Sequence, residues 1–329
     1  MPRRRQLLIS SIALPLLPVI SLLPTAVHAQ GFPDHPVKLV VGFPAGTGPD
    51  VVARTLGLKL QDILKQAVVI DNRAGAGGQI GALAVAKAPA DGYTLLLAEV
   101  GSISIAPAAY SKLPYDPARE LTPVAEVVRS DFILVVPPSS PVRDVKAFVA
   151  AARARPDRVN FGTFGAGTPG HFGAEMFGEL AGFKIEPIHY RATGDAITAL
   201  VAGDVQGAFV TTALAAPQIK AGKVRALATT AQARSPLLPD VPTFAESGLP
   251  QVDFSAWFAL MAPAETPSAA LDLLNRATVD ALQSTQVRKT LEEAGFTITG
   301  TSRADSSRMM KSEALRWASA VKATGFKAD

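Results

Sequence analysis

The 329-residue sequence contains no cysteine. This absence excludes disulfides, thiolate metal sites, a catalytic cysteine and a lipid-anchored N-terminal cysteine. Histidine is also scarce, and neither His35 nor His189 has a second histidine or a carboxylate at ligand spacing. A Gly-x-Ser-x-Gly elbow and a Walker loop are missing as well. We therefore expect no metal site, no cofactor and no catalytic residues.

Charge of one sign is scarce once the first residues are set aside. The whole chain has a formal net charge of +4, but residues 1–29 hold three arginines and no acid, so the remainder carries +1. No basic stripe marks that remainder, and nucleic acid is therefore not expected as a partner. Aromatic residues make up only 6% of the chain, whereas alanine, glycine and valine are abundant. That composition suits helices packed closely on parallel sheets.

The start of the sequence has the pattern of a signal peptide. Residues 3–5 are arginines, residues 7–23 are apolar, and residues 27–29 fit the small-x-small rule for cleavage. Three prolines interrupt the apolar run, which argues against a permanent membrane helix. We expect cleavage near Ala29 and export to the periplasm, by either the Sec or the twin-arginine route. The remaining residues, about 300, are enough for two ordinary domains.

A strand, a loop of small residues and a helix organise the first half of the chain. Residues 37–41 are mainly apolar and β-branched, as in a strand covered on both faces. The following prolines and glycines forbid regular structure, and Asp50 is placed to cap a helix expected over residues 51–64. Backbone N–H groups in such a loop, beside the positive end of a helix dipole, can bind an anion. The alternative is that these glycines only make a tight turn.

The same pattern recurs twice before residue 102. Strands expected over residues 68–72 and 94–98 end in two further small-residue segments, residues 73–78 and Gly101-Ser102. A β-α-β-α-β order in one sheet implies parallel strands and right-handed crossovers. The three loops then lie on the edge where ligands of open α/β sheets bind.

The later elements predict two domains joined by a hinge. A second α/β set follows residue 130, and the closing helices have no strand set of their own. We expect residues 30–129 plus 253–329 to form a discontinuous first α/β domain and residues 130–252 to form the second. The chain would cross between them near residues 125–132 and 250–256.

A second glycine-rich loop follows a strand expected over residues 159–163. It contains Gly165-x-Gly167-x-x-Gly170, which matches the dinucleotide fingerprint, and Glu186 lies near the position of the ribose-binding acid. However, the residues before this loop are polar or small where the fingerprint expects apolar ones, and Pro169 restricts it. The loop alone therefore does not establish a dinucleotide-binding site.

The competing interpretation is a second anion site that faces the first across a cleft. Thr163 and Thr168 would donate hydroxyl hydrogen bonds there, or one of them would cap the helix that follows. His171 could contact the ligand at the start of that helix, or it could serve in capping or packing. Arg73 and Arg191 follow strands and could meet an acid, although structural salt bridges would also explain them.

A series of segments runs in one order along nearly the whole chain after residue 29. The segments are Phe43-Pro44-Ala45-Gly46-x-Gly48-x-Asp50, Asp71-Asn72-Arg73-x-Gly75-Ala76-Gly77-Gly78, Ala90-Asp91-Gly92-Tyr93-Thr94, Leu113-Pro114-Tyr115-Asp116-Pro117, residues 219–228, Leu238-Pro239-Asp240-Val241-Pro242-Thr243, and Trp257-Phe258 with Ala262-Pro263-Ala264. Together they resemble the Bug-type (TctC-like) solute receptors of the tripartite tricarboxylate transporter family.

The resemblance implies a type II periplasmic-binding-protein fold, in which two α/β domains enclose a ligand cleft beside a hinge. It also implies a monomeric receptor that binds one small organic acid and delivers it to the membrane permease subunits of a tripartite tricarboxylate transporter. The acid's carboxylate would meet the first loop, and residues 163–171 would close from the other side. The predicted ligand-binding residues are Phe43, Pro44, Ala45, Gly46, Thr47, Gly48, Asp50, Gly101, Ser102, Thr163, Gly167, Thr168, His171, Tyr190, Arg191 and Thr211.

Four positions depart from the family pattern, and one of them is Ala106, which stands before Pro107 where an asparagine is usual. Val210 and Thr211 follow Phe209 where an aspartate is usual, which weakens the case for an amino-acid ligand. Ala192 replaces a glycine after Tyr190-Arg191. Glu99 follows a strand where small residues are usual, and inside a cleft it would repel one carboxylate or accept a hydrogen bond from a hydroxyl.

Two alternatives to the transport receptor stay open at this point. One is an exported NAD(P)-dependent oxidoreductase that uses the Gly165–Gly170 fingerprint. The other is a sensor-only receptor that presents its ligand-bound form to a signalling partner.

Overall fold

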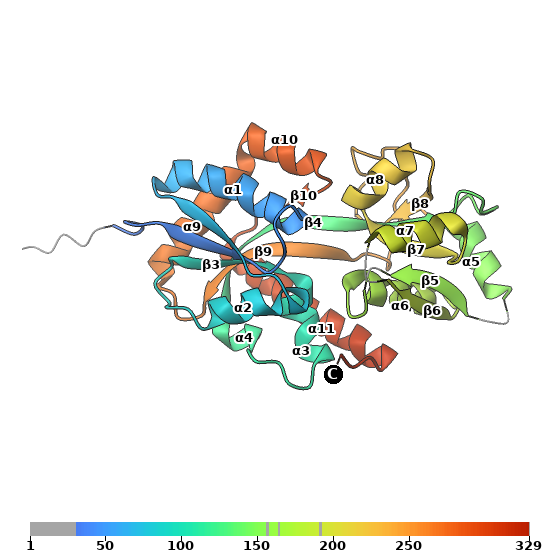
Figure 1. Cartoon of the computed structure of the whole chain (residues 1–329), viewed down its shortest axis with the longest axis horizontal. Coiled ribbons are helices and arrows are strands. Elements are labelled where there is room, and N and C mark those ends of the chain that lie inside the picture. The colour runs from blue at the N-terminus through green and yellow to red at the C-terminus, as the bar shows by residue number, and fades with distance from the viewer. Residues whose placement is uncertain (1–30, 156–157, 164, 191–192, 329) are drawn as a thin grey trace, which may run out of the picture. The chain divides into compact units, whose positions relative to one another are not determined.

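The computed structural model of the chain describes residues 31–155, 158–163, 165–190 and 193–328. Residues Phe32–Asp329 form one compact unit, in which helices cover a mixed ten-stranded sheet (Figure 1). The predicted signal peptide, residues 1–29, and the predicted site residue Arg191 lie outside the described residues. Within those residues, no helix is both long enough and apolar enough to span a bilayer.

One end of the sheet begins with three parallel strands, as the sequence predicts. β1 pairs with β2 on one side and β3 on the other. Helix α1 connects β1 to β2, and α2 connects β2 to β3, so the loops after all three strands lie on one edge. The elements are β1 (Val37–Val41), α1 (Gly48–Leu64), β2 (Val68–Asn72), α2 (Gln79–Ala86) and β3 (Thr94–Glu99).

Two antiparallel strands, β4 (Leu121–Val136) and β9 (Ser255–Pro263), connect this end of the sheet to the other. β9 pairs with β3 and with the first part of β4, as far as the Asp131–Ser255 pair. From Phe132 onward β4 pairs with new partners. β4 is a single 16-residue strand with two bulges along its pairing with β9. The bulges let one strand stay paired through Pro123, which has no N–H to donate.

The other end of the sheet is a second α/β set. β5 lies between β6 and β7 in parallel pairing, and β4 is antiparallel to both β7 and β8. The elements are α5 (Val145–Arg153), β5 (Val159–Thr163), α6 (Pro169–Ala181), β6 (Ile185–His189), α7 (Thr193–Ala202), β7 (Gly207–Thr211), α8 (Thr212–Lys220) and β8 (Arg225–Thr229).

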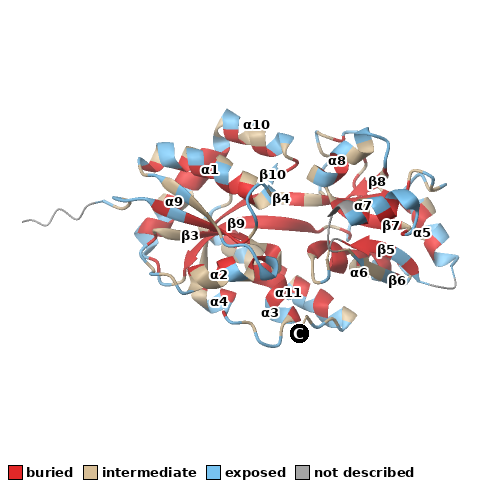
Figure 2. Cartoon of the chain, viewed as in Figure 1, coloured by how far each residue is buried: buried red, intermediate tan, exposed pale blue. Residues whose placement is uncertain are grey.

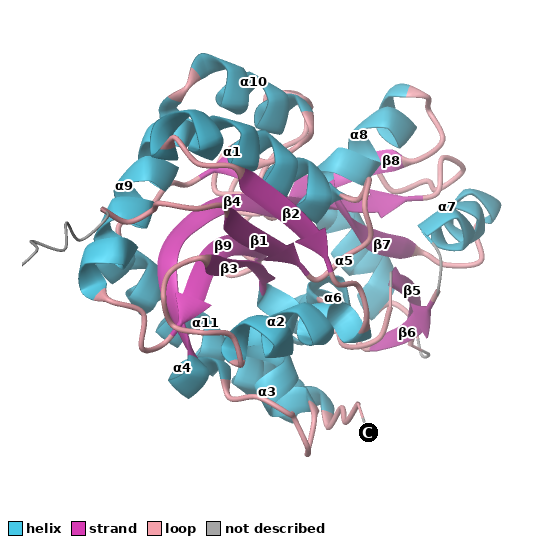
Figure 3. Ribbon diagram, turned by 60° about the vertical axis from the view of Figure 1, so that its left-hand side comes forward, coloured by secondary structure: helices cyan, strands magenta, loops and turns pink. Residues whose placement is uncertain are grey.

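The closing elements return to the first end of the sheet. Figure 3 shows α1, α9 and α10 on one side of this end and α2 and α11 on the other, so both faces are covered. Helix α11 also packs against α6 of the second set. The remaining elements are α3 (Ala106–Ala109), α4 (Pro117–Glu120), α9 (Ser268–Gln283), α10 (Thr285–Glu293), β10 (Thr297–Ile298) and α11 (Arg303–Thr324).

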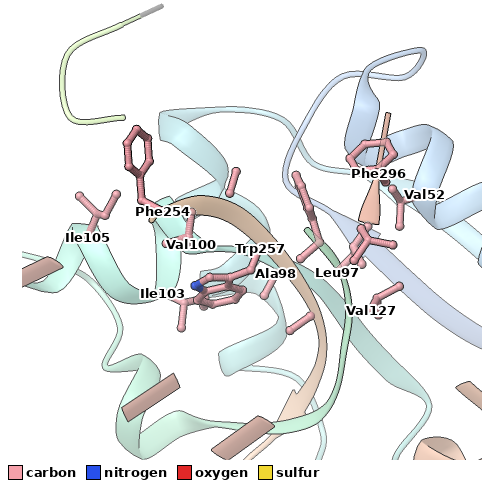
Figure 4. Packing of buried hydrophobic residues seen from close by; sticks show 14 of the residues in the cluster. Val52, Leu97, Ala98, Val100, Ile103, Ile105, Val127, Phe254, Trp257 and Phe296 are labelled. Atoms are coloured by element: carbon pink, nitrogen blue, oxygen red, sulfur yellow. The ribbon is translucent and has the colours of Figure 1, made fainter. Parts of the chain in front are cut away.

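The core follows from this double covering. Every residue of β9 is buried, and Figure 2 shows the central strands as the most buried part of the chain. Trp257 is fully buried, and Figure 4 shows its ring packed among Ala98, Val100 and Ile103. A strand covered on both faces reads as a continuous apolar run, as β9 does. The predicted division into residues 30–129 plus 253–329 and residues 130–252 stays a prediction.

Candidate ligand-binding site

A cavity of about 370 Å³ lies where the loops after β1, β2 and β3 face the loop before α6. Backbone and side chains of six segments line it. From the three loops come Phe43, Pro49, Ala76, Gly77, Glu99 and Gly101, together with Gln79 at the start of α2. From α3 and its flanks come Ile105, Ala106, Ala109 and Tyr110. From the second set come Ala166, Gly167, Thr168 and Pro169, and Phe258 and Ala328 complete the lining.

The first loop is organised by Asp50, which lies inside the first turn of α1. The sequence predicts a helix cap here, but α1 already begins at Gly48, with Thr47 at its N-cap position. The buried Asp50 carboxylate instead accepts from the N–H of Gly46 at 2.8 Å, Nε of Arg54 at 2.8 Å and Nδ2 of Asn72 at 3.0 Å. These bonds, with that of Arg54 the largest, lower the pKa of Asp50 to about 2. The ionised Asp50 carboxylate therefore stabilises the loop. Asp50 itself does not line the cavity.

The rest of the first loop curves away from the cavity lining. Residues 44–46 are exposed, and the Thr47 hydroxyl donates to the Pro44 carbonyl at 2.6 Å. Gly46 has a φ of +81°, which is a left-handed conformation that favours glycine. Of the predicted residues in this loop, only Phe43 lines the cavity, alongside Pro49.

The third loop is a single turn of π-helix, Gly101–Ile105, directly after β3. The N–H of Gly101 donates to Oε2 of Glu99 at 2.9 Å, and the hydroxyl of the buried Ser102 donates to the carbonyl of Glu99 at 3.0 Å. Gly101 lines the cavity, whereas Ser102 does not. Burial raises the pKa of Glu99 to about 7, against the opposing effect of the Gly101 N–H.

The start of α6 forms the opposite wall. The Thr168 hydroxyl donates to the Gly165 carbonyl at 2.8 Å and accepts from the His171 N–H at 3.4 Å, so it caps α6. The N–H of Gly167 donates to Nδ1 of His171 at 3.1 Å. A nitrogen that accepts carries no proton, so the His171 ring is neutral in this arrangement. Burial, followed by the neighbouring His189, lowers the pKa of His171 to about 4.

The other predicted residues of the second set that the structure describes do not line the cavity. Thr163 is buried, and its hydroxyl lies 2.7 Å from Nδ1 of His189. Tyr190 packs against the apolar cluster around β7 and β8. Thr211 stands at the N-cap position of α8 without a side-chain capping bond.

Several lining residues were not predicted. Phe258 belongs to the family pattern and Gln79 directly follows one of its segments, but neither residue was predicted to contact a ligand. Tyr110 follows α3 and Ala328 lies after α11, and neither was predicted as a site residue. Two contacts hold the end of the chain at the site. The ring centroid of Phe326 lies 5.4 Å from that of His171 and 5.5 Å from that of Phe172. The Ala328 N–H donates to the Ala109 carbonyl at 2.9 Å. Within the described ranges, no cluster of histidine and acidic residues could hold a metal ion.

Comparison with known proteins gives one family. A family model described as the tripartite tricarboxylate transporter family receptor (TctC) matches residues 52–326. Protein BugT of Bordetella pertussis is 37% identical over 302 residues, which cover 92% of this chain and 93% of that protein.

Solved structures agree with this similarity. Rpa4515 of R. palustris, solved with adipate, is 34% identical with a TM-score of 0.78, over 90% of this chain and 99% of that one. MatC (Rpa3494) of Rhodopseudomonas palustris, solved with bound malate, is 32% identical with a TM-score of 0.74, over 88% of this chain and all of that one. The predicted periplasmic-binding-protein fold is thereby confirmed.

Proposed function

This chain belongs to the family of tripartite tricarboxylate transporter receptors, and from that premise we propose that it binds a small organic carboxylate in the cavity between the β1–β3 loops and the start of α6. The observation that carries the proposal is the cavity itself. It lies at the edge of the sheet where loops from both strand sets meet, the position at which open α/β folds bind ligands. Relatives of similar fold hold malate and adipate.

The physical basis is a cavity with polar groups at few points in an apolar lining. The starts of α1, α2 and α6 meet the cavity at Pro49, Gln79 and Pro169, and the positive ends of these helix dipoles favour an anion there. Phe43, Tyr110 and Phe258 supply apolar surface for the body of the ligand. We propose Phe43, Gly101, Gly167 and Thr168 as ligand contacts. Specificity then arises because a wrong ligand leaves buried polar groups unpaired.

We propose that binding is coupled to closure of two domains, residues 30–129 plus 253–329 and residues 130–252. The observations behind this are the two crossings of the chain, between Asp131 and Phe132 in β4 and just before Ser255 in β9. Few-residue crossings of this kind can serve as hinges. Closure would bring Tyr190 and Thr211 toward the ligand.

The proposed biological role is delivery without catalysis. A monomeric receptor, exported with loss of residues 1–29, would present its closed form to the permease subunits of a tripartite tricarboxylate transporter in the membrane. The competing roles are an NAD(P)-dependent oxidoreductase and a receptor used only in signalling.

A thermal-shift screen of the exported protein tests the binding proposal. The panel contains malate, adipate, citrate, benzoate, nicotinate, aspartate, NAD and NADP. A ligand at one hundred times its Kd adds about 2.7 kcal/mol to the free energy of unfolding, which is several degrees for a chain of this size. We expect a shift with one class of acid and none with NAD or NADP. A shift with a dinucleotide alone would contradict the proposal.

A further inference from the structure

Glu99 is the one charged side chain among the described residues that line the cavity. It is the last residue of β3, and its neighbour across the sheet is Phe258 of β9. Ile105, Ala106 and Ala109 add further apolar surface to the same lining. A carboxylate in such a place has lost water without gaining a cation, which is costly for the charged form.

The contacts of Glu99 leave part of the carboxyl group available to a ligand. The Gly101 N–H donates to Oε2 at 2.9 Å, and an acid that is protonated on Oε1 can keep this bond. Burial raises the pKa of the group to about 7. The proton can therefore be added or lost near neutral pH without breaking the contact that holds the side chain.

We propose that Glu99 is a specificity-determining residue for dicarboxylates, and that it takes up a proton from solvent and donates its O–H to the second carboxylate of the ligand. This inference rests on the proposed function. Two carboxylates within hydrogen-bond distance in an apolar site do not both stay ionised, so one proton must be shared between them. The proton adds to one oxygen of Glu99, and no other bond forms or breaks.

Among the groups around the cavity, Glu99 should determine how ligand binding depends on pH. Gln79 of α2, Tyr110 after α3 and Thr168 of α6 line the same cavity, and of these only Tyr110 is titratable. Asp50, with a pKa of about 2, stays ionised above pH 6, and His171, with a pKa of about 4, stays neutral there. Burial also lowers the pKa of His189, which favours its neutral form.

The sign of the pH dependence follows from this arrangement. A group that gains a proton on binding makes affinity fall as pH rises above its pKa in the free protein. Adipate carries ordinary carboxyl groups, which are ionised throughout pH 6–9. The Kd for adipate should therefore rise about tenfold per pH unit above pH 7. An ionised Glu99 that accepts from a ligand hydroxyl or ammonium group predicts the opposite slope.

Titration calorimetry of the exported protein with adipate and with malate, at pH 6, 7, 8 and 9, tests the proposal. At pH 8, buffers of different protonation enthalpy should report uptake of close to one proton. Glu99→Gln, which can donate and accept, should keep binding but lose the proton uptake and the pH dependence. The exposed Glu186, paired with Arg158, supplies the control, and Glu186→Gln should keep the wild-type profile.

Four results would overturn the inference. A Kd that does not change with pH would do so. Affinity that rises with pH would also do so, because it would mean that the ligand binds to the ionised form of Glu99. Proton uptake that persists in a folded Glu99→Gln protein would place the proton elsewhere. Binding of neither acid by wild type or Glu99→Gln at any pH would overturn the inference alone, because the proposed function would still hold if another acid of the thermal-shift panel bound.

Discussion

The carboxylate of Asp50 joins three segments of the chain beside the cavity. It accepts hydrogen bonds from Gly46 in the first loop, Arg54 one turn along α1 and Asn72 at the end of β2. Nδ2 of Asn72 also donates to the Phe43 carbonyl at 3.0 Å. The backbone that carries Phe43 into the cavity is therefore positioned by a buried anion rather than by packing alone.

Asp50→Asn should lower both stability and ligand affinity. The folded-state pKa of about 2 lies below the ordinary 3.8, so the stabilisation by Asp50 is fully present above about pH 4 and is lost as pH falls through 2. Because Arg54 is half exposed, solvent screening reduces the expected loss to about 1–2 kcal/mol at pH 7. Chemical denaturation measures it, with Asp62→Asn on the exposed face of α1 as the control. Equal stability of the two variants would contradict this role.

At the level of residues, the sequence predicts identities in the site better than orientations. Gly101, Gly167 and Thr168 follow strands in chain order, so topology alone brings them to the cavity. Glu99 is the last residue of β3 and pairs with Phe258, so strand alternation sets the side to which it points, but the π-helical turn beyond it supplies part of the cavity lining. Periodicity carries no signal for such a turn. Ala328 lines the cavity because Phe326 packs on the second strand set, a long-range contact that local patterns do not show.

Helix α6 brings its N-terminus to the cavity with a cap that is itself part of the lining. The Thr168 hydroxyl is used twice, toward the Gly165 carbonyl and the His171 N–H. Nδ1 of His171 then accepts a hydrogen bond from the Gly167 N–H. These bonds connect the loop before Thr168 to the first turn of the helix after it. The hydroxyl predicted for ligand recognition therefore serves the helix in this structure.

Thr168→Val should loosen the start of α6 while keeping the shape of the side chain. Loss of an N-cap costs roughly 0.5–2 kcal/mol of stability, and the carboxylate ligand should bind more weakly because the loop that lines its cavity is less ordered. Thr168→Ser retains the hydroxyl and should restore both. Thermal unfolding and calorimetry measure the two effects. If Thr168→Val had the same stability and affinity as Thr168→Ser, the Thr168 cap would support neither property.

At the level of elements, patterns predict the regular parts and fail where pairing is long-range. The strands β1, β2 and β3 are found close to their expected bounds, because a short apolar run bounded by turn residues leaves a local signature. The sequence does not predict one continuous β4, because Pro123 and the polar residues Glu126, Arg129 and Asp131 interrupt its apolar run. Pairing with β9 and the buried Glu126–Arg129 ion pair accommodate these residues.

The two strand sets approach each other closely at Gly295, after α10. A Cβ placed on this glycine would lie 2.7 Å from the backbone of Ala213 in α8. Gly295 also has a φ of +82°. The contact joins a segment of the first set to a helix of the second, on the opposite side of the chain crossings from the α6–α11 packing.

Gly295→Ala should hinder this approach and reduce ligand affinity. A left-handed conformation costs a non-glycine residue about 1–2 kcal/mol, and the overlap with Ala213 adds a displacement of α8. Gly300→Ala separates the two effects, since Gly300 has a φ of +61° but its nearest neighbour would lie 3.5 Å away. We expect both variants to lose stability and only Gly295→Ala to lose affinity, as calorimetry would show. Equal affinity in the two would argue against closure of the two sets around the ligand.

The central claim is that an organic carboxylate binds in the cavity between the β1–β3 loops and the start of α6. Ala166 is exposed and lines that cavity, whereas the exposed Ala108 does not line it. The decisive measurement is titration calorimetry of the acid that gives the largest thermal shift against wild type, Ala166→Trp and Ala108→Trp. We expect binding to be lost in folded Ala166→Trp and kept in Ala108→Trp. Unchanged affinity in Ala166→Trp would place the ligand elsewhere and contradict the account.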